Sequence, residues 1–178
     1  VKYHKNDPEI DLIKLKKEIN KTFSKVPYEI SFEPGRYLIA KAGALVTSII
    51  TTKINGGINY LITDAGMHSL IRPALYNAHH DIEALEVESN HEFEYTIAGP
   101  ICESTDIFRK SIKLPKQNIG DILIIKDVGA YGAVMASNYN SRGLPAQILI
   151  NKKSFSTIYK PKKIEDNISE DFIPNWLT

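Results

Sequence analysis

A change in hydrophobic pattern near residue 45 constrains the possible folds of this chain more than any other feature. Residues 45–52 form a run rich in valine, isoleucine and threonine, the β-branched residues that favour strands. Asn55-Gly56-Gly57 then offers the backbone freedom that a hairpin turn needs, and residues 60–64 supply the returning strand. We therefore expect a β hairpin at the start of a mainly β domain.

The rest of the chain continues this β pattern. Strands are predicted at residues 91–98, where polar and apolar residues alternate, and at residues 121–125. A second hairpin is predicted from residues 146–150 and 155–159, and a short helix around Trp176. We expect these elements to form one mostly antiparallel domain of about 130 residues, a usual size for a single core.

The first 36 residues follow a different pattern. Asp7-Pro8 is typical of a helix start, and apolar residues at mostly helical spacing predict a helix over residues 8–24. Residues 28–32 alternate and predict a short strand that leads into Glu33-Pro34-Gly35-Arg36. This order matches one unit of an α/β fold, in which functional groups lie at the carboxyl ends of strands. Glu33 and Arg36 are therefore candidates for a site.

Composition argues against several classes of partner. The formal net charge is only +1, which predicts no basic surface for nucleic acid. No apolar run approaches the roughly 18 residues of a membrane-spanning segment. The single cysteine excludes an internal disulfide and fits a reducing, cytoplasmic compartment.

Three short motifs contain residue types suited to chemistry. Cys102-Glu103 places a thiol beside a carboxylate, which suits acid–base or nucleophilic chemistry, although a lone cysteine is more often inert and buried. Arg72, close to Tyr76, can hold a carboxylate or phosphate through two parallel hydrogen bonds, although loop arginines are commonly solvated. His79-His80 with Glu83 has metal-binding residue types, but the spacing matches no metal site, so no metal is expected.

Several motifs become more specific when they are read in order along the chain. They are Glu33-Pro34-Gly35-Arg36, Asp64-Ala65-Gly66-Met67, Arg72-Pro73-Ala74-Leu75-Tyr76, Gly99-Pro100-Ile101-Cys102-Glu103-Ser104-Thr105-Asp106, Gly129-Ala130-Tyr131-Gly132 and Ser137-Asn138-Tyr139-Asn140-Ser141-Arg142. Between about Glu33 and Tyr159 the sequence resembles the carboxyl-terminal part of the diaminopimelate decarboxylase family. The resemblance implies a pyridoxal-phosphate-dependent enzyme of the alanine-racemase-like fold type. Residues 1–36 would be the remnant of a truncated, cofactor-binding TIM barrel, and residues 37–178 a carboxyl-terminal β-sandwich or β-barrel domain.

The implied reaction removes one carboxylate from meso-2,6-diaminopimelate and gives L-lysine and CO2, the last step of lysine biosynthesis. The cofactor-binding residues that the resemblance implies are Glu33, Gly35, Arg36 and Tyr131. The implied substrate-binding residues are Arg36, Arg72, Tyr76, Glu103 and Tyr131. In this pattern Glu33 keeps the pyridine nitrogen of the cofactor protonated, so that the ring can withdraw electrons.

Cys102 has the catalytic role in this pattern, because it returns a proton to the carbon that has lost CO2. The family supplies the Cys102-Glu103 loop across a two-fold dimer interface, which implies a homodimer with shared active sites. The family also needs a Schiff-base lysine, a histidine stacked on the cofactor and a glycine-rich phosphate loop. None of these matches a motif in this sequence. The chain is therefore expected to be a fragment that is inactive by itself.

Two alternatives share part of the pattern. A related decarboxylase acting on ornithine or arginine would have the same fold, but its substrate lacks the distal carboxylate that Arg72 would recognise. A non-enzymatic dimerisation module would retain the β domain without needing Cys102, Glu103 or Tyr131.

Overall fold

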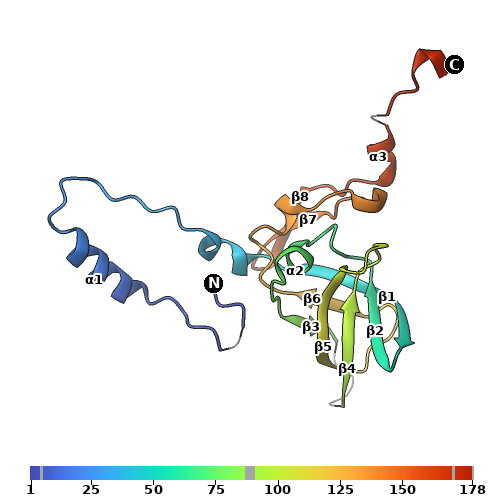
Figure 1. The fold of residues 1–178 in the computed structure, drawn as a ribbon, viewed down its shortest axis with the longest axis horizontal. Coiled ribbons are helices and arrows are strands. Elements are labelled where there is room, and N and C mark those ends of the chain that lie inside the picture. Colours follow the sequence, from blue (N-terminus) through green and yellow to red (C-terminus); the bar gives the residue numbers. More distant parts are fainter. Residues whose placement is uncertain (5, 87–90, 170, 178) are drawn as a thin grey trace.

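The computed structural model describes residues 1–4, 6–86, 91–169 and 171–177 of the chain (Figure 1). Its main body is a six-stranded sheet. The strands of this sheet are β1 (Leu45–Asn55), β2 (Ile58–Thr63), β3 (Ile82–Ala84), β4 (Glu92–Ala98), β5 (Ile107–Pro115) and β6 (Ile122–Ile125). The helices are α1 (Leu12–Phe23), α2 (Arg72–Tyr76) and α3 (Ile164–Ile168). Short 3-10 turns are η1 (Arg36–Leu38), η2 (Ala40–Ala42), η3 (Ala133–Met135), η4 (Tyr139–Ser141) and η5 (Asn175–Leu177).

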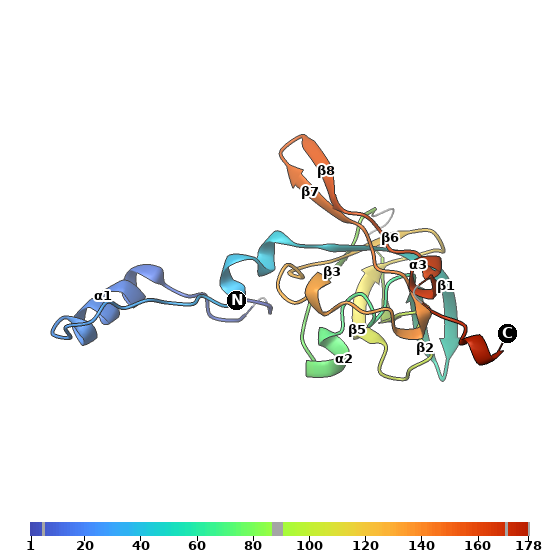
Figure 2. The ribbon, with the colours of Figure 1, turned by 90° about the horizontal axis from the view of Figure 1, so that it is seen from above.

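The sheet has the strand order β3-β6-β1-β2-β4-β5. All its pairs are antiparallel except β2 with β4, which run parallel. The edge strands β3 and β5 contact each other, so the sheet curls into a nearly closed barrel (Figures 1 and 2). The expected mainly β fold of barrel type is confirmed.

The inside of this barrel is the hydrophobic core. Its most deeply buried side chains come from β1, β2, β4, β6 and the segment before α2: Ile49, Leu61, Leu70, Ile97, Leu123 and Ile125. In β6 the alternate residues Leu123 and Ile125 are buried, as the period of two requires. The core therefore provides a rigid support for the loops at the strand ends.

The hairpin predicted around Asn55-Gly56-Gly57 is confirmed. β1 pairs with β2 through Asn55 and Ile58, and both turn glycines have positive φ, at 56° and 78°. The predicted strands at 91–98 and 121–125 correspond to β4 and β6. The predicted second hairpin corresponds to β7 (Gln147–Asn151) and β8 (Ser154–Tyr159), which pair only with each other in the described part of the chain.

In the first 36 residues the predicted helix is confirmed with a later start, and the predicted strand is wrong. The helix begins at Leu12 rather than near Pro8, because the side chain of Asp11 caps it by accepting hydrogen bonds from the N–H groups of Ile13 and Lys14, both at 2.9 Å. Residues 28–32 are extended but form no strand, since they have no ladder partner among the described residues. The α1 helix stands apart from the barrel (Figures 1 and 2).

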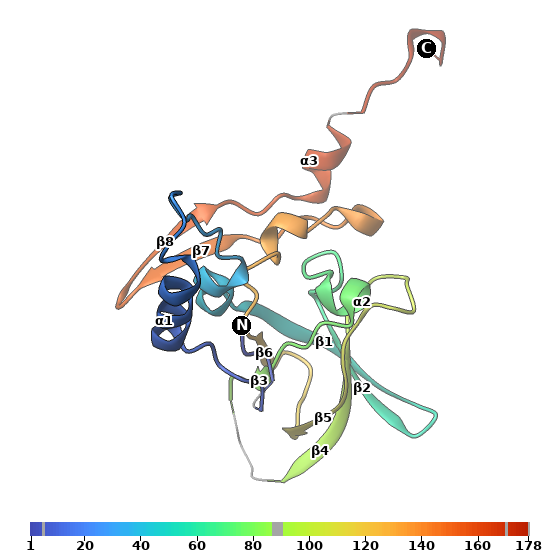
Figure 3. The same cartoon turned by 60° about the vertical axis from the view of Figure 1, so that its left-hand side comes forward.

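The C-terminal part lies beside the barrel. β7 and β8 form a separate ribbon, and α3 and η5 extend away from the sheet (Figure 3). The short helix predicted around Trp176 is confirmed as η5. Among the described residues, no helix combines the length and apolar character needed to cross a bilayer.

Candidate functional site

Four of the sequence-predicted site residues meet in one cleft. Arg36 of η1, Arg72 and Tyr76 of α2, and Tyr131 in the loop after β6 line a cavity of about 660 Å³. The remaining lining residues are Tyr3, His4, Asp7, Ala78, His79 and Met135. The cleft thus joins the N-terminal segment to two loops of the barrel.

Arg72 is the most constrained of these side chains. It is only 5% exposed, and its Nη1 donates to the Tyr3 hydroxyl at 3.3 Å and lies 3.1 Å from Nε2 of His80. Both partners are electrically neutral groups, and within the described residues no carboxylate pairs with Arg72. Because an unpaired buried charge is costly, this guanidinium is suited to receive an anion from outside the chain.

Tyr3 links the two arginines of the cleft. The Cζ atoms of Arg36 and Arg72 each lie 5.2 Å from the centre of its ring. Cations in this position are attracted to the face of the ring, so Tyr3 holds both guanidinium groups beside one cavity. The site can therefore bind a ligand with two anionic groups.

His80 supports Arg72 from inside the barrel. Its Nδ1 donates to the carbonyl oxygen of Lys126 at 2.8 Å. Burial lowers the pKa of His80, and the hydrogen bond to the Lys126 carbonyl opposes part of this effect. The weaker effects of the charges of Arg72 and Asp127 lower and raise the pKa, respectively. The imidazole is therefore neutral at pH 7.

Close backbone packing fixes Tyr131 relative to Arg36. The N–H of Val128 donates to the carbonyl of Gly43, and the N–H of Gly129 donates to the carbonyl of Ala40, both at 3.0 Å. A β-carbon on Gly43 would lie 2.6 Å from the Cα of Gly129, so the two segments touch where neither has a side chain. Tyr131 itself has a φ of 63°, a left-handed conformation that costs energy for a tyrosine.

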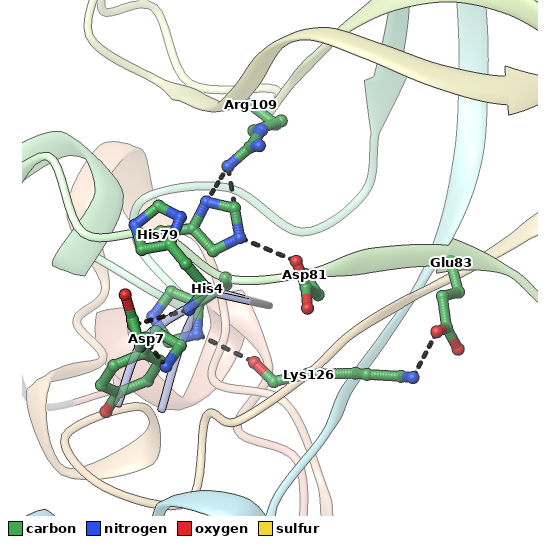
Figure 4. Close-up of polar contacts among 9 residues, drawn as sticks. His4, Asp7, His79, Asp81, Glu83, Arg109 and Lys126 are labelled. Carbon is green, nitrogen blue, oxygen red and sulfur yellow. Dashed lines mark hydrogen bonds and ion pairs between the residues drawn. The ribbon is translucent and has the colours of Figure 1, made fainter. Parts of the chain in front are cut away.

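The wall of the cleft next to His79 is a polar cluster (Figure 4). His79 contacts Asp81 through Nε2 at 2.7 Å and Arg109 through Nδ1, and its ring centroid lies 3.8 Å from that of His4. Lys126 pairs with Glu83. The residues described by the structure include no group of three or more histidines, cysteines or carboxylates placed to hold a metal.

Cys102 and Glu103 lie outside the cleft. They occupy the loop between β4 and β5, where Cys102 is exposed and its N–H donates to the side-chain oxygen of Asn140 at 3.3 Å. The Glu103 carboxylate accepts hydrogen bonds from the Thr105 N–H and hydroxyl and from the Ser104 hydroxyl, which lower its pKa. The loop therefore presents a thiol and a carboxylate to the outside of this chain.

Glu33 and Gly35 also lie outside the cleft lining, in the exposed segment that leads into η1. A β-carbon on Gly35 would meet no atom within 4 Å, so this side of η1 is open. Open backbone at Gly35, directly before Arg36, fits the phosphate of pyridoxal phosphate. Among the residues described, no lysine lines the cleft.

Three residues that organise the site were not predicted from the sequence. Tyr3 and His80 hold Arg72, and Asp106 anchors the Cys102 loop. A buried arginine requires acceptors, so the pair His79-His80 shortly after it was the available signal for His80. Tyr3 gave no such signal, because it lies 69 positions from Arg72.

Comparison with known proteins shows the family to which the chain belongs. Residues 20–129 match the family model described as the pyridoxal-dependent decarboxylase C-terminal sheet domain. The diaminopimelate decarboxylase of Buchnera aphidicola (Schizaphis graminum) is 40% identical over 156 residues, which cover 81% of this chain and 38% of that protein. The crystal structure of diaminopimelate decarboxylase from Methanocaldococcus jannaschii has a TM-score of 0.91 at 36% identity, covering 100% of this chain and 42% of that chain.

The same M. jannaschii enzyme in complex with L-lysine gives the same TM-score of 0.91 and 36% identity. The chain thus spans only 38% and 42% of the lengths of these two relatives. The family match nevertheless covers the barrel from β1 to β6 and the cleft residues Arg36 and Arg72. The chain belongs to the pyridoxal-dependent decarboxylases and contains the C-terminal sheet domain of that family.

Proposed function

We propose that this chain is the carboxyl-terminal part of an enzyme that decarboxylates meso-2,6-diaminopimelate to L-lysine and CO2, the last step of lysine biosynthesis. The observation that carries the proposal is the buried Arg72, whose charge no carboxylate of the described chain balances. A substrate with a carboxylate at each end needs such a group to hold the end that does not react. Relatives named diaminopimelate decarboxylases, one of them in complex with L-lysine, support this choice.

Arg36 and Gly35 would bind the phosphate of pyridoxal phosphate, with Tyr131 beside it. Glu33 would approach the pyridine nitrogen and keep it protonated. The bound cofactor supplies an electron sink for the pair of electrons that the departing CO2 leaves on the α-carbon. Arg36 would also contact the substrate, because it shares the ring of Tyr3 with Arg72 and lines the same cleft.

Arg72 and Tyr76 would bind the distal carboxylate, and Tyr131 would contact both substrate and cofactor. Glu103 would bind the distal amino group, because its ionised form is already favoured by hydrogen bonds. Together these residues select a substrate with an amine and a carboxylate at its far end.

Cys102 would act as the proton donor. Its Sγ–H gives a proton to the α-carbon from which CO2 has left, and the exposed thiolate then recovers a proton from solvent. Neither Cys102 nor Glu103 lines the cleft of its own chain. A two-fold homodimer in which each loop enters the partner's cleft supplies both residues.

Residues 1–36 would belong to the cofactor-binding barrel, and residues 37–178 would form the β domain. The groove between α1 and the extended segment after it supports this division. It is lined by apolar side chains including Leu12, Leu15, Phe23 and Phe32, which no core of the described chain covers. We assign the enzyme to the cytoplasm, where the exposed Cys102 stays reduced.

The test uses the full-length protein that contains this chain, loaded with pyridoxal phosphate. CO2 release is measured with meso-diaminopimelate, L-ornithine, L-arginine and L-lysine. We expect release from meso-diaminopimelate alone, with L-lysine as product. Comparable release from ornithine or arginine would replace the proposal with the related decarboxylase class, and no release from any substrate would favour a dimerisation module.

A further inference from the structure

We infer that His80 is a positioning residue, which orients Arg72 toward the distal carboxylate of the substrate. The inference rests on the proposed function. His80 is 2% exposed and lies beneath the cleft without lining it. Its two ring nitrogens contact Nη1 of Arg72 at 3.1 Å and the Lys126 carbonyl at 2.8 Å.

The hydrogen bonds define one tautomer of His80. A carbonyl oxygen only accepts, so Nδ1 carries the proton that is donated to Lys126. In the neutral ring Nε2 then has a free electron pair, which accepts from the Nη1 of Arg72. The tautomer thus turns the acceptor side of the ring toward the arginine.

The contacts of Arg72 leave one edge of its guanidinium for a ligand. Nη1 has two N–H groups, and its two partners are His80 and the hydroxyl of Tyr3. In the described part of the chain, Nε and Nη2 have no hydrogen-bond acceptor. These two donors form the fork that binds a carboxylate with two parallel hydrogen bonds.

The backbone between the two residues explains their contact. α2 ends at Tyr76, and its C-cap residue Asn77 adopts a left-handed conformation with a φ of 52°. The N–H of Ala78 donates to the carbonyl of Arg72 at 3.3 Å. The chain therefore turns back, and β3 begins directly after His80 and Asp81. This turn places His80 under the arginine that begins α2.

Two small ligands distinguish the effect of a His80 substitution on carboxylate binding by Arg72 from its other effects on the protein. L-Lysine retains the distal carboxylate after decarboxylation, whereas 1,5-diaminopentane has the same amines and no carboxylate. The ratio of their affinities for the full-length, cofactor-loaded enzyme, measured by calorimetry, reports how well Arg72 binds a carboxylate. Binding is measured without turnover, so a change in catalysis does not affect the ratio.

The two variants His80→Asn and His80→Gln test the two hydrogen bonds of the His80 ring separately. Asparagine can replace the Nδ1 donor to Lys126 but leaves Arg72 without its acceptor. Glutamine places an oxygen near the Nε2 position and restores that acceptor. His68→Asn is the matched control, because His68 is also a buried histidine at 5% exposure and does not line the cleft.

We expect His80→Asn to weaken the binding of L-lysine about 10- to 100-fold, which is the effect of one hydrogen bond to a charged group. The affinity for 1,5-diaminopentane should stay within about threefold of the wild-type value. His80→Gln and His68→Asn should keep the wild-type ratio within about threefold. If wild type itself shows no preference for L-lysine, the proposed function is wrong. If wild type prefers L-lysine and His80→Asn keeps that preference, or if His80→Gln loses it tenfold, only the role of His80 is overturned.

Discussion

The carboxylate of Asp106 accepts a 2.6 Å hydrogen bond from the backbone N–H of Met67, although the two residues are 39 positions apart. Its other oxygen accepts the N–H of Ile101 at 2.8 Å. Gly66 and Gly99 lie directly against this carboxylate, where a β-carbon would overlap it. Asp106 thus fastens the loop that carries Cys102 to the loop that follows β2.

Asp106→Asn should lower the free energy of unfolding by about 1–3 kcal/mol, because an amide has one acceptor oxygen and leaves one buried N–H unpaired. Chemical denaturation measures this loss. Asp11→Asn is the matched control, since a single oxygen of Asp11 accepts both of its N–H groups and asparagine caps helices equally well. Equal effects of the two substitutions would contradict the role assigned to Asp106.

Cys102→Ala should reduce turnover of the full-length enzyme by about 10²- to 10⁴-fold, the usual contribution of a general acid. Because Cys102 is exposed, the free energy of unfolding should change by less than about 0.5 kcal/mol. Steady-state kinetics measures the turnover, chemical denaturation measures the free energy of unfolding, and cofactor absorbance shows whether the cofactor is still bound. Loss of cofactor together with turnover would show that the cysteine is structural.

Gly129→Ala should destabilise the protein by about 1–3 kcal/mol or more, because the new methyl group would overlap the carbonyl oxygen of Ile39. The same overlap would displace Tyr131 from η1 and reduce cofactor affinity. Thermal unfolding and cofactor titration report these two changes. Ala42→Ser, which adds one atom at an exposed neighbouring position, should change neither.

Acidification should destabilise the protein through His68. Burial lowers the pKa of His68, and the charge of Arg142 lowers it further, against an opposing effect of Asp64. The unfolded chain therefore binds a proton near pH 6.5 while folded His68 stays neutral, so stability is full above about pH 6.5 and is lost as the pH falls toward the folded pKa. Denaturation between pH 7.5 and 5.5 should show a smaller decline for His68→Asn than for wild type. Identical declines would assign the pH dependence to other groups, among them His80.

The 178-residue chain alone should not form a specific covalent bond with pyridoxal phosphate, because no lysine among its described residues lines the cleft. After incubation with the cofactor and borohydride, peptide mass spectrometry should find no single lysine labelled in preference to the others. Specific labelling of one lysine would contradict the placement of the cofactor site.

The hairpin of β1 and β2 was predictable because its turn and both strands are local in sequence. The strand expected at residues 28–32 was wrong because alternation creates a strand only where another strand supplies hydrogen bonds. β5 was missed for a different reason. Ser111 has a φ of 51°, and the pairing with β4 shifts between Tyr95 and Ile97, so the alternation of β5 is broken at a bulge.

The residues of the candidate site show the same contrast between local motifs and contacts of distant segments. Arg36, Arg72, Tyr76 and Tyr131 were predicted from compact motifs, and the fold brings them into one cleft. The partners that orient Arg72 depend on contacts between distant segments, such as Tyr3 with Arg72 and Lys126 with His80. Sequence pattern alone contains little information about such contacts.

β1 pairs on one side with β2, which follows it immediately, and on the other side with β6, which is complete only at Ile125. During synthesis the second edge of β1 therefore has no partner until β6 has left the ribosome. A nascent chain that stops before β6 exposes an unpaired apolar strand, the kind of surface that drives aggregation. The growing polypeptide is therefore protected from self-association through β1 only after β6, the last strand of the barrel, has been synthesised.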